Sequence, residues 1–84
     1  MGGRDLPGEV TSSEVIKVLL AHGWLEEPLL ATGHRQFSLA DGSRKVTVQH
    51  PERFGTRRKS LVFKSILRQM GISRATFAKW YHEK

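Results

Sequence analysis

Three stretches of the chain space their apolar residues as an α-helix does. The first covers residues 12–22, where Thr11 and Glu14 form a capping box and Gly23 provides a stop. Its apolar positions are Val15, Ile16, Leu19 and Leu20. Residues at this spacing share one side of a helix, so we expect this side to enter the core.

The other two helical stretches follow near the end of the chain and are separated by Gly71. Ser60 and Ser73 can cap them, because a serine hydroxyl accepts hydrogen bonds from the free amides of a first turn. The apolar stripes are Phe63, Ile66, Leu67 and Met70 in the first, and Phe77, Trp80 and Tyr81 in the second. The second stripe packs on the sheet or stays partly exposed as a partner surface.

Between the helices, apolar and polar residues alternate as in β-strands. Residues 34–40 and 44–49 alternate on either side of Asp41-Gly42, a strong signal for a hairpin turn. The inward positions are Phe37, Leu39, Val46 and Val48. Residues 24–31 give a weaker strand signal, since Pro28 cannot donate to a strand ladder.

The order of one helix, three strands and two helices indicates the α+β class. We expect a three-stranded antiparallel sheet with the helices packed on one face. Residues 11–84 are expected to form one small domain, since a chain of 84 residues buries roughly 60% of its unfolded surface. Residues 1–10 are expected to be a disordered lead-in, and they lack the charged-then-apolar pattern of a signal peptide.

The composition argues against several kinds of site. The absence of cysteine removes disulfides, thiolate nucleophiles and cysteine-bound metals, and it suits a cytoplasmic location. No apolar run approaches the roughly 20 residues of a membrane span. The four histidines lack the helical spacing of a ligand pair, and Glu26 and Glu27 point to opposite faces of a strand. We therefore expect no metal and no cofactor.

Positive charge is concentrated in the second part of the chain. Residues 1–34 carry two basic and five acidic side chains, a net charge of −3, whereas residues 35–84 carry twelve and three, a net charge of +9. A one-sided positive field attracts polyanions, although a solvated surface explains such an excess equally well. Residues 52–59 are expected to form an irregular basic loop, which either contacts phosphates or is simply mobile and solvated.

His34 is the histidine best placed for chemistry. It begins a strand beside Gly33, whose missing side chain lets a ligand come close. An imidazole can move a proton at neutral pH. From position alone, however, a strand residue without a role is the simpler interpretation. Through the turn at residues 41–42, we expect Arg35, Arg44 and Lys45 to lie near it.

Four segments, in the same order along the chain, resemble the HicA-type (YcfA-like) mRNA interferase toxins. They are SSEVIKVLLAHGW (12–24), GHRQF (33–37), DGSRKVTVQHP (41–51) and FKSILRQMGIS (63–73). The resemblance implies a fold like that of double-stranded-RNA-binding domains, cleavage of mRNA with His34 as the catalytic histidine, and a cognate HicB-type antitoxin that blocks it. The chain departs from the family at Leu61-Val62, where Gly-Thr is frequent, and at Arg35, where many members have a second histidine.

Cleavage of this kind requires few protein groups. RNA brings its own nucleophile, the 2′-hydroxyl, so the protein supplies a proton-transfer group and cations that stabilise the pentacoordinate phosphorane. We predict His34 for the first role, with no metal. The predicted RNA contacts are Arg35, Arg44, Lys45, Arg57, Arg58 and Lys59. The alternative is a non-catalytic module that binds RNA or another nucleic acid through the same basic face.

The remaining histidines are expected to have structural roles first. His22 ends a helix, where a cation is favourable, and His82 lies in a tail that is expected to fray. His50 follows the last strand and either shapes the loop or touches RNA. The aromatic residues expected in the core are Trp24, Phe37 and Trp80.

Overall fold

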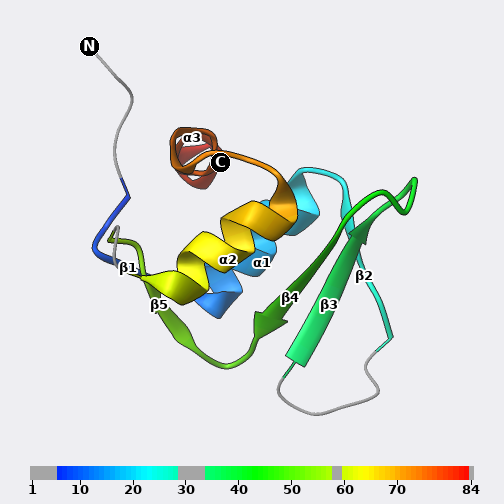
Figure 1. Ribbon diagram of the computed structural model, residues 1–84, viewed down its shortest axis with the longest axis horizontal. Helices are drawn as coiled ribbons and strands as arrows, with labels where there is room; N and C mark the ends of the chain where they lie inside the picture. Colours follow the sequence, from blue (N-terminus) through cyan, green and yellow to red (C-terminus); the bar gives the residue numbers. More distant parts are fainter. Residues whose placement is uncertain (1–5, 29–33, 58–59, 84) are drawn as a thin grey trace.

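The computed structural model describes residues 6–28, 34–57 and 60–83 (Figure 1). Its elements, in chain order, are β1 (Glu9–Thr11), α1 (Ser12–Ala21), β2 (Trp24–Glu26), β3 (His34–Leu39), β4 (Lys45–Gln49), β5 (Arg53–Gly55), α2 (Leu61–Met70) and α3 (Arg74–His82). Strands β2, β3 and β4 form an antiparallel three-stranded sheet in that order, and β1 pairs with β5 in a second, two-stranded sheet. The predicted α+β class is confirmed.

The β3–β4 hairpin turns where the sequence predicts. Gly42 has a φ of +75°, which favours glycine, and an Asp41 side-chain oxygen accepts a hydrogen bond of 2.9 Å from the amide of Ser43. The pairing places Phe37 opposite Val46, and both side chains are fully buried. Successive residues of a strand point to opposite faces, so one face of the sheet is apolar and the other carries polar side chains.

The helices cover the apolar face of the sheet. Helices α1 and α2 both contact β4, and α1 also contacts β2. Helix α3 packs against α1, on the side of the helix pair away from the β3–β4 hairpin (Figure 1). The opposite face of the three-stranded sheet is left without a helix over it in the described part of the chain.

The helix ends match most of the predicted caps. The capping box of Thr11 and Glu14 is present, and the Ser73 side chain accepts a hydrogen bond from the amide of Thr76. Gly71 ends α2 with a φ of +76°. Ser60 occupies the N-cap position of α2, but its side chain makes no capping hydrogen bond, so this part of the prediction is wrong.

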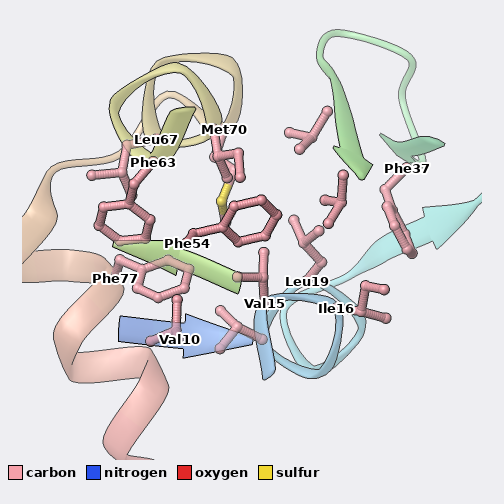
Figure 2. Close-up of a cluster of buried hydrophobic side chains, with 14 of the residues drawn as sticks. Val10, Val15, Ile16, Leu19, Phe37, Phe54, Phe63, Leu67, Met70 and Phe77 are labelled. Atoms are coloured by element: carbon pink, nitrogen blue, oxygen red, sulfur yellow. The ribbon is translucent and has the colours of Figure 1, made fainter. Parts of the chain in front are cut away.

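One hydrophobic core joins the three helices and both sheets (Figure 2). Phe63 of α2 and Phe77 of α3 meet edge to face, with ring centroids 5.3 Å apart. Trp24 and Phe37 are buried as predicted, whereas Trp80 and Tyr81 only border the core. The last stripe is therefore partly exposed rather than fully packed.

Two segments depart from the sequence-based prediction. Residues 6–10 are not a disordered lead-in: Leu6 and Val10 are buried, and Val10 lies opposite Phe54 in the β1–β5 pair. Residues 52–59 are likewise not wholly irregular, because β5 lies within them. Residues 1–5 lie outside the described residues. Each of these strands has three residues, too few for an alternating pattern to stand out, and each exists because the other completes it.

The weaker strand signal of residues 24–31 is confirmed only at its beginning. Strand β2 ends at Glu26, before Pro28, and residues 29–31 are outside the described ranges. Across these ranges, no helix has the length and apolar character that a membrane crossing requires.

Candidate active site

His34 is the first residue of β3, opposite Gln49 of β4. Its side chain is exposed, and because Phe37 points into the core, the alternation of the strand turns His34 toward the polar face of the sheet. Within residues 6–28, 34–57 and 60–83, its imidazole has no hydrogen bond or ion pair. The imidazole is therefore available to a ligand on that face.

Arg35 points the other way, toward the helices. Its guanidinium donates two hydrogen bonds to the Glu26 carboxylate, each 2.5 Å long, and it also lies 5.9 Å from the centroid of the Phe37 ring. These hydrogen bonds lower the pKa of Glu26 and raise that of Arg35. The expectation that Arg35 and His34 share one surface is therefore wrong, because alternation puts the two side chains on opposite faces, whereas the contact of Arg35 with RNA stays a prediction.

Lys45 lies at the other end of the hairpin from His34. Lys45 pairs with Ser38, which is four residues from His34 along β3. At about 3.3 Å per residue, these four residues span roughly 13 Å. A hairpin brings together residues that are equally far from its turn, and for His34 that partner is Gln49. The predicted closeness of Arg44 and Lys45 to His34 is therefore wrong. The Lys45 ammonium instead lies 3.6 Å from a Glu27 carboxylate oxygen.

Arg44 reaches the C-terminal end of α2. A Cβ atom at Gly71 would lie 2.5 Å from the guanidinium carbon of Arg44, so the two residues are in direct contact. The free carbonyl groups at a helix C-terminus carry partial negative charge, which favours a cation there. Arg44 therefore belongs to the surface of α2 rather than to the surroundings of His34.

The basic loop before α2 is described only in part. Arg57 is exposed, and its carbonyl oxygen accepts a hydrogen bond of 2.9 Å from the amide of Ser60. The predicted contacts Arg58 and Lys59 lie outside the described residues. Arg57 thus remains a candidate contact at the beginning of α2.

His50 is tied to the beginning of α1. Its Nδ1 atom lies 2.7 Å from the hydroxyl of Ser12, a buried residue, and this hydroxyl also accepts a hydrogen bond of 3.1 Å from the amide of Glu52. The Ser12 hydroxyl thus joins the His50 ring to the backbone of Glu52. The structural role expected for His50 is present, and it holds the end of β4 against α1.

A pocket of about 470 Å³ opens beside His50, lined by Thr11, Ser12, Ser13, His50, Pro51, Glu52 and Arg53. His34 does not line it. Sequence reasoning could not find the contact between Ser12 and His50, because 38 residues separate them and no local pattern joins them.

The other two histidines lie on α1 and α3. His22 is the C-cap residue of α1, as expected, and its ring stacks on Trp80 with centroids 3.9 Å apart. His82 is the last residue of α3 and meets the Tyr81 ring edge to face, so it does not belong to a frayed tail. Both imidazoles are half-buried, and His22 lies near Leu39, at the end of β3 that is away from His34.

The described part of the chain contains no group of three histidine, cysteine, aspartate or glutamate residues that could hold a metal ion. Among the described residues, the site presents one unpaired imidazole on the polar face of the sheet, and none of the predicted cations Arg35, Arg44 and Lys45 lies beside it on that face. Comparison of the chain with family models, with curated proteins and with solved structures finds no match.

Proposed function

We propose that this protein is an endoribonuclease of the HicA type, an mRNA interferase that uses His34 as its proton-transfer group. The observation that supports the proposal most directly is the position of His34, exposed on the polar face of the sheet with its imidazole unpaired among the described residues. The four segments that carry the resemblance fall on α1, the β3–β4 hairpin and α2, in the element order of a double-stranded-RNA-binding-like fold.

The reaction is a transesterification in which the 2′-oxygen bonds to phosphorus and the bond to the 5′-oxygen breaks. One proton leaves the 2′-hydroxyl and one joins the departing 5′-oxygen, and His34 carries one of these two transfers. The products are a 5′-hydroxyl and a 2′,3′-cyclic phosphate, or the 3′-phosphate that forms when water opens the cyclic phosphate. Because the nucleophile belongs to the RNA, no metal-bound water is required.

Cleavage of RNA by the purified protein in excess chelator tests the proposal. We expect His34→Ala and His34→Gln to abolish cleavage, because neither side chain can carry the proton. Gln36→Ala is the matched control, since Gln36 is exposed on the same face two residues along β3. Products with 3′-hydroxyl ends, or a strict requirement for a divalent ion, would contradict the mechanism.

The same proposal includes a HicB-type antitoxin that covers His34. His34 lies on an open sheet face, so a partner can block RNA simply by occupying that face. In a binding assay, RNA and antitoxin should compete, and His34→Ala should keep most of the antitoxin affinity because one imidazole is a small part of an interface. A complex that binds RNA with undiminished affinity would refute this arrangement.

A second candidate function is a non-catalytic module that binds RNA. It is favoured by the number of exposed cations without a carboxylate partner in the described ranges, among them Lys64 and Arg68. Such a module would bind RNA, would not cleave it, and would be indifferent to His34→Ala. The cleavage assay therefore separates the two functions.

A further inference from the structure

The chain contains no acidic residue between Glu52 and Glu83. The basic residues of this interval are Arg53, Arg57, Arg58, Lys59, Lys64, Arg68, Arg74 and Lys79. Helix α2 lies in the middle of it. Since no carboxylate is close in sequence, the cations of this helix can be neutralised only by acidic residues brought from elsewhere in the fold.

The solvent side of α2 carries two of these cations in a row. The buried side of the helix consists of Phe63, Ile66, Leu67 and Met70. Lys64 and Arg68 are exposed on the other side, one turn apart and about 6 Å apart along the axis. Neither forms an ion pair with any residue that the structure describes. In Figure 1, α2 crosses in front of α1, and no other element covers it.

Two further cations lie near the two ends of the helix. The Arg44 guanidinium lies against Gly71, directly after the last turn of α2, and Arg57 is exposed just before the first turn. Neither has a carboxylate partner within the described ranges. We call these four residues the α2 basic face: Arg57, Lys64, Arg68 and Arg44.

Several cations of the two sheets, in contrast, lie close to carboxylates. Arg35 is bound by Glu26, and Lys45 lies close to Glu27. Arg53 of β5 pairs with Glu9 of β1 at 3.3 Å. A nearby carboxylate offsets part of the charge of each of these cations, so they contribute less to binding a polyanion than the α2 basic face does.

We infer that the α2 basic face binds the phosphodiester backbone of the RNA outside the segment that reaches His34, because α2 lies over the other face of the sheet. This inference rests on the proposed function. Unpaired lysine and arginine side chains along one helix face suit a chain of regularly spaced phosphates, with arginine able to donate two hydrogen bonds to one phosphate. Leu61 and Val62 are exposed beside this face, but two apolar side chains are few for a protein interface, which buries about 800 Å² per partner. Binding to the backbone selects no base.

The test measures binding of a fluorescent RNA with 2′-O-methyl groups, which cannot be cleaved, at several salt concentrations. The variant is Lys64→Ala with Arg68→Ala. The matched control is Lys17→Ala with Lys79→Ala, which removes the same charge from exposed positions on α1 and α3. Lys17 shares a groove with Glu14 and Glu83 rather than with other cations.

For single-stranded RNA, each lost phosphate contact should reduce the slope of log affinity against log salt by about 0.7. The α2 variant should therefore lose about 1.4 in slope and roughly 25-fold in affinity at 0.1 M salt, whereas the control should change little. Arg44→Ala should add a further loss of about 0.7 in slope.

Equal affinity and slope in the α2 variant and the unchanged protein would overturn the inference, even where His34-dependent cleavage is intact. The converse result, loss of binding in the α2 variant with no cleavage by any form, supports the inference and refutes the proposed function. Binding of the α2 basic face to anionic lipid vesicles, with RNA binding unaffected by the same substitutions, would also overturn it.

Discussion

Weakening the contact between β1 and β5 should destabilise the whole domain. Val10 and Phe54 lie opposite each other in this pair, and both are buried in the common core. Val10→Ala removes two methyl groups, worth about 1.6 kcal/mol in transfer free energy and about 2 kcal/mol once the remaining cavity is included. Phe54→Leu should cost about 1 to 1.5 kcal/mol. An 84-residue domain has only about 4 to 13 kcal/mol of stability, so both losses are measurable.

Urea unfolding followed by tryptophan fluorescence measures these losses, because Trp24 is buried in the same core. In the double variant, the loss in free energy of unfolding should differ from the sum of the two single losses by about 0.5 kcal/mol or more, as expected of residues in contact. Leu61→Ala is the control: this leucine is 77% exposed, so its loss should change the free energy of unfolding by less than about 0.5 kcal/mol. If Val10→Ala behaves like the control, residues 6–11 do not belong to the folded domain and the reasoning fails.

Three further predictions concern single contacts. Gly71→Ala should cost about 1 to 2 kcal/mol in thermal unfolding, because it imposes a positive φ on alanine, whereas the exposed end of the Arg44 side chain can move away from the new Cβ; an unchanged midpoint would contradict the left-handed cap. Ser12→Ala should cost about 1 to 3 kcal/mol in urea, since it leaves an imidazole and an amide without their partner. Because the bond from Arg35 lowers the pKa of Glu26, their pair stabilises the fold above the ordinary carboxyl pKa, and this contribution is lost as pH falls through the lowered value. Glu26→Gln should therefore be less stable than the unchanged protein at pH 7 and equal to it at low pH; a difference that persists in acid would point to packing instead.

The elements that the sequence predicts well are those whose pattern is local and long enough to repeat. Helices α1 and α2 show several apolar positions at helical spacing, and the hairpin shows two alternating strands around Asp41-Gly42. Strands β1 and β5 have three residues each and pair residues such as Val10 and Phe54, 44 positions apart. Such a pair forms only when the rest of the core brings its strands together, so no local sequence pattern predicts it.

Two errors about the site were avoidable from the sequence itself. A turn at residues 41–42 sets the register of the hairpin, and this register pairs His34 with Gln49 and leaves Lys45 near the turn. The period of two along a strand likewise places Arg35 and His34 on opposite faces. Nearness in sequence was a poor guide to nearness in space, because in a hairpin the distance from the turn decides which side chains meet.

The distribution of charge required the structure, because charges are neutralised by contacts that the sequence does not order. Glu26 and Glu27 belong to the acidic part of the chain, yet they lie beside Arg35 and Lys45 of the basic part. Net charge by segment therefore overstated the positive field around the hairpin. Around α2, the net charge by segment did not overstate the positive field. The chain has no carboxylate between residues 52 and 83, and the fold brings none to Lys64 or Arg68 from the other described residues. The charge excess that persists in the folded protein therefore coincides with an interval without acidic residues, centred on a helix whose apolar side packs in the core.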